Sequence, residues 1–397
     1  MRLVVVSHKI CWSSPESPGG YATDGGFPLQ IKAISELFDE TELLVPCTST
    51  DSLEGTSPLD GKRLSITSLT VPKGTGLRRK FDMLIWTATN GLRIWRAVKN
   101  ADAVHTPIPG DVGTIGMMTA LLLRKRLFVR HCGNWMMPRT ISERLWRWLM
   151  ERFAGGRNVM MATGGSDTPP SNRNPNVKWI FSTSLKSDQM KNDVRREPPC
   201  DRKLRLVIAC RQEERKGTDI VIDALALLAK KFENATLDVI GDGSKLESLQ
   251  RQADRLNVKD RVVFHGKIRP ADVLNVMSKG HLFCYPTSAS EGFPKVVLEA
   301  LATGLPVITT KVSVLPSLLE SGCGVLLEAA SAEELAKSIE KVCGDRDIYS
   351  QMSKCAITTA RRYSLENWRD AIGQALSDAW KVDSLGHKRQ VPELIRS

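Results

Sequence analysis

Two carboxylates at a fixed spacing offer chemistry in the last third of the chain. Glu291 and Glu299 bracket the stretch Gly292-Phe293-Pro294-Lys295-Val296, where a loop gives way to an apolar, helix-like pattern. Glu291 lies in the loop and can accept hydrogen bonds from hydroxyl groups. Glu299 lies about one and a half turns into the expected helix and can reach a ribose. This spacing suits a ligand that carries both sugar hydroxyls and phosphates.

The elements around these two glutamates predict a phosphate site. Residues 282–285 form an apolar, strand-like run, a loop follows, and a helix is expected over 294–303. Gly292 has no Cβ, so the backbone can approach a ligand closely. The free N–H groups of the first helical turn point toward the loop with the positive end of the helix dipole. We therefore expect an anionic group to bind at the start of this helix.

The rest of the chain alternates strand and helix patterns, which predicts an α/β fold with parallel sheets. Strands are expected at 3–6, 43–45, 103–105, 127–129, 204–209, 237–240, 262–264, 282–285 and 306–309, and helices after Pro28 and at 219–231, 245–256, 294–303 and 364–380. A long loop rich in glycine, serine and proline separates the first strand from the first helix. A polar stretch over 182–203 is the expected linker. We predict two Rossmann-like domains, 1–190 and 200–364, facing each other across a cleft, with a helix at about 365–397 packing back onto the first.

Composition excludes several classes of protein. The chain has 397 residues, of which 42% are hydrophobic and 25% charged, so disordered and collagen-like architectures do not apply. Nine scattered cysteines form no C-x-x-C pair, which favours reduced thiols in a cytosolic protein over disulfides or zinc. No apolar run has the length of a membrane span. Residues 1–200 carry 27 Lys and Arg against 18 Asp and Glu, an excess of nine positive charges that suits an anionic partner.

The motif around Glu291 and Glu299 resembles the E-x7-E motif of retaining glycosyltransferases of the GT-B fold, glycosyltransferase family 4 (group 1). Other blocks extend the resemblance over about 204–364. In the family, a basic pair after the first strand of the second domain grips the donor diphosphate, and Arg211 and Lys216 match it. Gly241 matches the next glycine turn. Ile268 closes a segment whose backbone meets the nucleotide base in the family.

The first domain matches the family less closely. Gly25 and Gly26 resemble its glycine loop near the donor phosphate, and they precede the first expected helix. His131 ends a strand that resembles the one carrying the family's active-site histidine. His105 lies in a strand that resembles one with a cleft-facing histidine, and a packed core histidine is an equal interpretation of it.

The resemblance implies transfer of a sugar from a nucleotide-diphosphate sugar to an acceptor hydroxyl, with retention at the anomeric carbon. It implies catalytic roles for His131, Glu291, Arg211 and Lys216, and donor binding by Gly25, Gly26, Gly241, Ile268, Gly292, Phe293, Pro294, Lys295, Val296 and Glu299. No cofactor and no metal are expected, since the basic pair and the helix start replace the metal that other folds use. A glycan or lipid-linked acceptor at the cytoplasmic face of a membrane, in polysaccharide assembly, is the typical setting of such relatives.

Several alternatives stay open. A nucleotide-sugar epimerase, a glycan phosphorylase with pyridoxal phosphate or a non-catalytic nucleotide-sugar-binding protein could share this architecture. No nucleic-acid-binding motif supports a nucleic acid as partner. Asp345-Arg346-Asp347 matches a metal-binding D-x-D motif superficially, and a solvated turn is the favoured interpretation.

The segment 143–153 combines tryptophans with basic residues, so contact with an acidic membrane is one hypothesis for it. The favoured alternative is an ordinary amphipathic helix whose apolar side chains Trp146, Leu149 and Phe153 pack on their own sheet.

Overall fold

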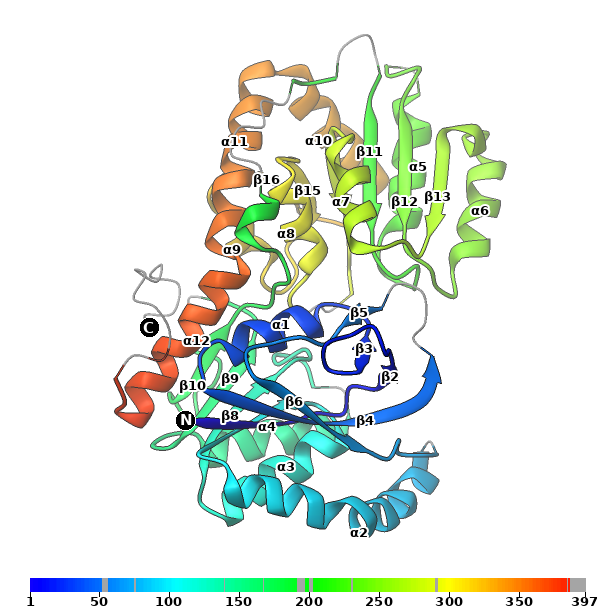
Figure 1. Ribbon diagram of the computed structural model, residues 1–397. Coiled ribbons are helices and arrows are strands. Elements are labelled where there is room, and N and C mark those ends of the chain that lie inside the picture. The colour runs from blue at the N-terminus through cyan, green and yellow to red at the C-terminus, as the bar shows by residue number, and fades with distance from the viewer. Residues whose placement is uncertain are drawn as a thin grey trace. The chain divides into compact units, whose positions relative to one another are not determined.

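The computed structural model describes residues 1–51, 56–74, 76–138, 140–166, 168–190, 197–199, 203–229, 231–289, 292–383 and 385. The chain divides into two compact units, Met1–Ser184 with Leu365–Ser397, and Leu185–Ser364. Each unit holds a largely or wholly parallel sheet with helices packed against it (Figure 1). The expected α/β fold with two parallel-sheet domains is confirmed.

The sheet of the first unit has a parallel centre in the order β10-β9-β8-β7-β1-β4, with β6 beside β4. These strands are β1 (Arg2–Val6), β4 (Glu40–Asp51), β6 (Leu64–Leu69), β7 (Ala103–Ile108), β8 (Arg126–His131), β9 (Asn158–Thr163) and β10 (Val177–Ile180). The order reverses at β1, which pairs with β4 on one side and β7 on the other. Parallel sheets of this kind bind ligands where the order reverses, at the carboxyl ends of the strands.

The expected loop between the first strand and the first helix contains two short strands. They are β2 (Cys11–Ser13) and β3 (Tyr21–Thr23), which pair with each other in antiparallel fashion, and β3 pairs with β5 (Ser57–Pro58). The expectation of a structureless loop was therefore wrong. Strands of three residues are too short to show a period-two pattern, so sequence periodicity misses them.

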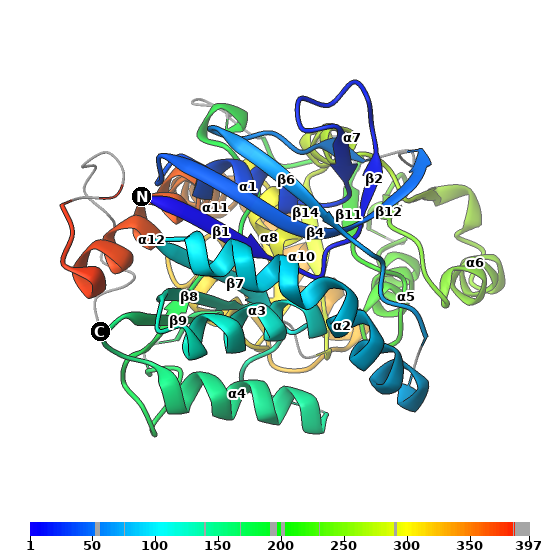
Figure 2. The same ribbon diagram turned by 60° about the horizontal axis from the view of Figure 1, so that its bottom comes forward.

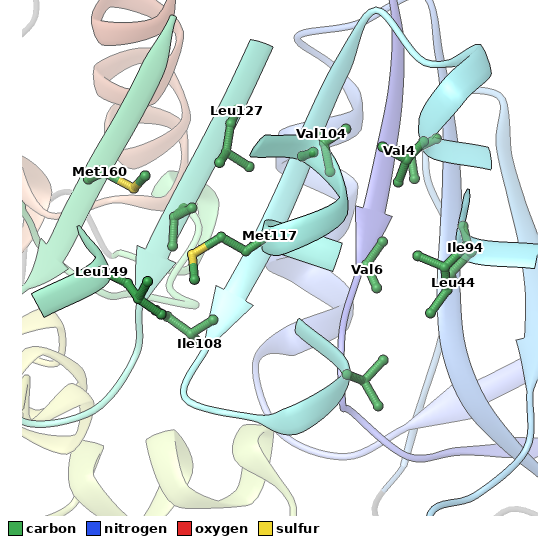
Figure 3. Packing of buried hydrophobic residues seen from close by; sticks show 14 of the residues in the cluster. Val4, Val6, Leu44, Ile94, Val104, Ile108, Met117, Leu127, Leu149 and Met160 are labelled. Atoms are coloured by element: carbon green, nitrogen blue, oxygen red, sulfur yellow. The ribbon is translucent and has the colours of Figure 1, made fainter. Parts of the chain in front are cut away.

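Helices α2 (Gly76–Asn100), α3 (Asp111–Leu122) and α4 (Ile141–Phe153) cover one face of this sheet (Figure 2). Their buried side chains share one hydrophobic core with the strands. Figure 3 shows Met117 of α3 lying among Ile108, Leu127 and Val104 of the strands. Helix α1 (Phe27–Ser35) and helix α12 (Leu365–Trp380) pack against each other on the other face.

The sheet of the second unit is parallel throughout, in the order β13-β12-β11-β14-β15-β16. Its strands are β11 (Arg205–Ala209), β12 (Thr236–Ile240), β13 (Val262–Gly266), β14 (Leu282–Tyr285), β15 (Val307–Thr310) and β16 (Gly324–Leu327). Its helices are α5 (Thr218–Leu228), α6 (Leu246–Arg255), α7 (Pro270–Ser278), α8 (Lys295–Ala302), α9 (Leu315–Leu319), α10 (Ala332–Gly344) and α11 (Arg346–Arg362). The order reverses between β11 and β14, which places the loops after these two strands at the same edge.

A buried carboxylate links three neighbouring strands of the second unit by hydrogen bonds. Asp238 on β12 accepts hydrogen bonds from the Arg205 guanidinium on β11, at 2.5 and 2.9 Å, and from His265 Nε2 on β13, at 2.7 Å. Burial alone would raise the pKa of Asp238, but the hydrogen bonds from Arg205 and His265 outweigh it and hold that pKa below its usual value. The ionised carboxylate therefore stabilises the folded sheet at neutral pH.

Asp238→Asn is expected to lower the free energy of unfolding by about 2–3 kcal/mol at pH 7, because it removes the charge that pairs with Arg205 and His265. The wild-type carboxylate adds stability above its unfolded pKa of 3.8 and loses that contribution as the pH falls through its lower folded value. The difference between the two proteins should therefore shrink below about pH 4. Urea unfolding across this pH range measures it, with Asp254→Asn as control because Asp254 is exposed and pairs with Lys259 only at 3.6 Å.

Candidate functional site

The predicted donor-site residues of the second unit all follow the carboxyl ends of its strands. Arg211 and Lys216 follow β11, Gly241 follows β12, and Ile268 follows β13. The residues 292–296 and Glu299 follow β14 and enter α8. The topology therefore brings them to one edge of a single sheet. Glu291, the first glutamate of the motif, lies outside the described residues.

Gly241 packs the turn after β12 directly against the loop after β11. A Cβ at this position would lie 1.9 Å from the Cys210 carbonyl oxygen, and the φ of Gly241 is +113°. The Gly241 N–H donates to the Gly266 carbonyl at 2.8 Å, which ties the turn to the end of β13 as well. Glycine is required here for close backbone packing.

Gln212 is a buried residue of this edge that the sequence patterns did not single out. Its Nε2 donates to the carbonyl oxygens of Cys210 and Ile240, both at 3.1 Å, and its Oε1 accepts from Thr218 Oγ1 at 2.7 Å. The residue is fully buried. One amide thus satisfies carbonyls at the ends of two strands and fixes the start of α5. The available signal was a single uncharged polar residue within the charged run Arg211-Gln212-Glu213-Glu214-Arg215-Lys216.

Arg215 joins the loop after β11 to the loop after β14. Its carbonyl oxygen accepts hydrogen bonds from the N–H groups of Ser288 and Ala289, both at 3.0 Å. Its guanidinium donates to the Ser288 carbonyl at 2.7 Å. The backbone of Arg215 has a φ of +67°, which turns the chain toward these partners. This residue, also missed from sequence, fixes the loop that leads toward Glu291.

The two cations predicted to meet a diphosphate differ in their surroundings. The Arg211 side chain is 82% exposed, and its guanidinium lies 3.5 Å from the Glu213 carboxylate. Such an exposed pair contributes little to stability, so Arg211 can turn toward an anionic ligand. Lys216 is half-buried and precedes Gly217, which begins α5 in the left-handed conformation. These positions let both cations act near the strand ends.

Helix α8 begins one residue later than expected, at Lys295, with Pro294 as its N-cap residue. No side chain caps this helix start, and the Val297 N–H donates to the Pro294 carbonyl oxygen at 3.0 Å. Phe293 is buried, with its ring centroid 5.9 Å from that of Tyr363, and this contact anchors the entry to the helix. Gly292 and Val296 are half-buried on either side.

Glu299 is a carboxylate without a hydrogen bond or ion pair to any described side chain. Burial raises the pKa of Glu299, and Lys295, one turn earlier on α8, opposes this in part. A carboxylate in this setting gains from ligand hydroxyl groups that donate to it.

The first unit holds the remaining predicted residues. His131 ends β8 and is 2% exposed, with its ring edge-on to that of Trp135 at a centroid distance of 5.3 Å. Burial lowers the pKa of His131 to about 4, and the nearby Gly133 backbone opposes this only in part. The imidazole is therefore neutral at pH 7. Gly25 has a φ of +72°, and Gly26 is the N-cap residue of α1.

Two further predicted features have structural roles. His105 is fully buried, stacks on Phe128 at a centroid distance of 4.3 Å, and its Nδ1 lies 3.0 Å from the Phe128 carbonyl oxygen. It is a core histidine. Asp345 is the N-cap residue of α11, and its carboxylate accepts from the N–H groups of Asp347 and Ile348 at 3.0 Å. Among the described residues, no group of three or more His, Cys, Asp or Glu side chains is placed to hold a metal ion.

A comparison with protein families identifies the second unit. Residues 190–359 match the family model of glycosyl transferases group 1. This part of the chain is similar to the glycosyl transferases group 1. The group 1 match contains the loops after β11, β12, β13 and β14, and the expected family resemblance is confirmed.

Curated relatives match part of the chain. An uncharacterized glycosyltransferase of Haemophilus influenzae is 32% identical over 153 residues, which is 38% of this chain and 42% of that protein. The phosphatidylinositol N-acetylglucosaminyltransferase gpi3 subunit of Schizosaccharomyces pombe is 33% identical over 118 residues, 30% of this chain and 26% of that protein. The chain therefore spans less than half the length of these relatives.

Solved structures extend the likeness beyond the group 1 domain. The crystal structure of Anabaena Alr3699/HepE in complex with UDP has a TM-score of 0.71 and 19% identity, and the match covers 95% of this chain and all of that chain. At this identity the likeness establishes the fold. The chain has the fold of GT-B glycosyltransferases, as expected from its sequence.

Gln212→Ala is expected to lower the free energy of unfolding by roughly 2–4 kcal/mol, because it leaves a cavity and removes three buried hydrogen bonds. Gln252→Ala is the matched control. The Gln252 amide also donates to Asp219 and Asp223, but it is half-buried on the surface of α6, so its loss should change stability by less than about 1 kcal/mol. Urea unfolding measures both variants, and equal effects would contradict the role assigned to Gln212.

His131→Asn is expected to flatten the loss of stability on acidification. In the unfolded chain a histidine has a pKa of 6.5, whereas the folded value for His131 is about 4. The unfolded state therefore binds more protons between these values, and the wild type should lose roughly 2 kcal/mol from pH 7 to pH 5 through this residue. Above pH 6.5 the effect is absent. Denaturant unfolding at each pH measures the slope, and equal slopes in the two proteins would contradict the assignment.

Proposed function

We propose that the protein transfers a sugar from a nucleotide-diphosphate sugar to a hydroxyl of a glycan or lipid-linked acceptor, with retention at the anomeric carbon. One observation carries the proposal. The cationic loop after β11, the Gly241 turn and the uncapped start of α8 lie at one edge of a group 1 glycosyltransferase domain. Such an edge combines positive charge with exposed backbone N–H groups, which a diphosphate needs.

In this mechanism, negative charge develops on the leaving diphosphate as the glycosidic bond breaks. Arg211, Lys216 and the first N–H groups of α8 stabilise that charge without rearranging at the moment of reaction. Lys295 adds a positive charge at the same helix start. No step requires a metal ion.

The remaining donor contacts follow from the chemistry of each group. Glu299 accepts hydrogen bonds from the ribose hydroxyls, which compensates the desolvation that raises its pKa. Glu291 holds hydroxyls of the donor sugar, and the backbone near Ile268 meets the base. His131, neutral at pH 7, contacts the donor sugar, and Gly25 and Gly26 let the backbone approach the phosphates.

We further propose that the second domain, 200–364, binds the donor and the first domain, 1–190, binds the acceptor. The named relatives support this class of substrates. The Schizosaccharomyces pombe relative belongs to a phosphatidylinositol N-acetylglucosaminyltransferase, and the Anabaena structure contains UDP. An acceptor of this kind places the enzyme at the cytoplasmic face of a membrane, where a lipid-linked glycan is reached from the water side.

The proposal predicts that a nucleoside diphosphate stabilises the protein without added metal. A ligand at a concentration of 100 times its Kd adds roughly 2.7 kcal/mol to the free energy of unfolding. Lys216→Ala should weaken this effect and lower kcat/KM roughly 10- to 100-fold, because a charged contact to phosphate is lost. Lys259→Ala, at an exposed lysine of the same unit, should leave both unchanged.

Thermal unfolding against a panel of nucleoside diphosphates and nucleotide sugars measures the stabilisation, and transfer assays measure kcat/KM. Conversion of the nucleotide sugar without an acceptor would favour an epimerase. Stabilisation without any turnover would favour a non-catalytic binding protein. No stabilisation of the folded chain by any nucleotide would contradict the proposal.

A further inference from the structure

Large apolar side chains are exposed in one part of the chain. Among the described residues, fifteen large hydrophobic side chains are exposed, and all but Ile10, Leu227 and Val263 lie between Phe81 and Trp148. The residues from Phe81 to Trp148 in this set belong to α2, α3, α4 and the segment before α4. An exposed apolar concentration of this kind marks an interaction surface.

Helix α2 is apolar on two opposite sides. Its inner side places Trp86, Ile94 and Val98 in the hydrophobic core. Its outer side exposes Phe81, Leu84, Ile85, Leu92 and Trp95, with exposed fractions from 38% to 72%. The outer residues are separated by three, four or seven residues along the helix, so they form one stripe.

Helix α4 (Ile141–Phe153) also exposes apolar side chains, next to the side that packs on the core. Trp146, Leu149 and Phe153 pack on the core, as expected for an amphipathic helix, and Trp146 Nε1 donates to Thr114 Oγ1 at 2.7 Å. Ile141, Leu145 and Trp148 lie about 100° around the helix from that side and are exposed at 84%, 52% and 50%. The favoured interpretation of this helix is thus correct for its inner side. It leaves the outer side unexplained.

Helix α3 connects the two stripes. It packs beside α2 on the same face of the sheet and exposes Met118 and Leu122. Figure 2 shows α2, α3 and α4 side by side in front of the strands. We call the exposed side chains of these three helices the α2–α4 surface.

The charged groups on the α2–α4 surface are of one sign. Exposed basic side chains on α2 are Arg78, Lys80, Arg93, Arg96 and Lys99, and those on α4 are Arg144 and Arg152. None of the carboxylates on the described parts of the three helices is exposed. Asp82, Asp111 and Glu143 are half-buried, and Glu151 is buried, with Asp111 held by Arg79 at 2.7 Å and Glu151 by Arg147 at 3.0 Å.

We propose that the α2–α4 surface docks on a lipid bilayer that carries anionic headgroups. The apolar stripes enter the boundary between headgroups and acyl chains, and the arginines and lysines pair with lipid phosphates. Trp95 and Trp148 are partly exposed, and indole rings favour this interfacial depth. No helix in the described parts of the chain has the length and hydropathy to span a membrane, so docking is peripheral.

Charge argues against the other occupants of this surface. A second copy would bring the same basic side chains against one another in a two-fold interface, where like charges oppose association. A nucleic acid would meet the arginines and lysines but would leave the apolar stripes in water. An anionic bilayer satisfies both components at once.

This inference deepens the proposed function, since a docked enzyme meets a lipid-linked acceptor in two dimensions. Its test needs no sugar transfer. Flotation of the full chain with vesicles of pure phosphatidylcholine, and with vesicles of equal parts phosphatidylcholine and phosphatidylglycerol, measures docking directly. We expect binding to the anionic vesicles only. Binding should weaken with added salt, as the screening length falls from about 10 Å at 0.1 M to about 3 Å at 1 M.

Paired variants separate the contribution of the apolar side chains from that of the basic side chains. Leu145→Ser with Trp148→Ser should weaken vesicle binding about tenfold or more, because buried apolar area is lost. Leu227→Ser with Val263→Ser, exposed at 50% each in the second unit, is the matched control. Arg96→Ala with Arg144→Ala should weaken binding about 25-fold, since each basic side chain near an anionic surface contributes about fivefold. Lys279→Ala with Lys341→Ala is its control.

Three outcomes would overturn the proposal. They are no binding to anionic vesicles, equal binding to both vesicle types, and unchanged binding by the α4 and arginine variants. Lipid-free sedimentation gives a fourth test, because self-association that the Leu145 and Trp148 changes abolish would make this face an interface between copies. Nucleotide stabilisation measured without vesicles reports on the proposed function separately, so either idea can fail alone.

Discussion

The contact between the Gly241 backbone and the Cys210 carbonyl constrains the whole ligand edge of the second unit. The approach is too close for any side chain, so the turns after β11 and β12 share one small space. The carbonyl groups of Cys210 and Ile240 lie in this space, where buried polar groups need hydrogen-bond partners. The Gln212 amide donates to both carbonyl groups from within the same loop, and the Cys210 N–H also donates to the Ile240 carbonyl at 3.0 Å. The turns after β11 and β12 are thereby held together by backbone contacts and one uncharged side chain.

The Arg211 guanidinium, whose side chain is 82% exposed, takes no part in these backbone contacts. Arg215 fixes the loop after β14 mainly through its backbone carbonyl, and a Cβ on Gly217 would lie 2.5 Å from the Pro286 carbonyl oxygen. Three loops are thus held against one another by backbone contacts. The Arg211 side chain is not needed for these contacts. Backbone contacts therefore hold the loops in place. Cations that are carried by such a rigid frame need no rearrangement when negative charge develops on a diphosphate.

The sequence predicted those elements whose position depends on a local pattern of residues. Apolar runs located the long strands, and the glycine and glutamate spacing located the start of α8 to within one residue. The roles of Gln212 and Arg215 could not be predicted, because they depend on carbonyl groups contributed by distant strands. His105 was ambiguous for the same reason, since its stacking on Phe128 depends on the pairing of β7 with β8. The outer stripe of α2 was missed because a helix that is apolar on both sides shows no simple amphipathic period.

The net positive charge is distributed unevenly along the chain, and this indicates that the two units bind different kinds of anionic partner. Residues 76–153 carry 14 Lys and Arg against 5 Asp and Glu, an excess of nine, which equals the excess of residues 1–200 as a whole. The rest of that half is therefore balanced. Residues 201–397 carry 29 against 26, an excess of only three. A diphosphate needs a few cations at fixed points, and the second unit supplies them from a nearly balanced surface. A broad positive field suits an extended anionic surface instead, and nine of the 14 Lys and Arg of 76–153 lie on the helices that also expose apolar side chains.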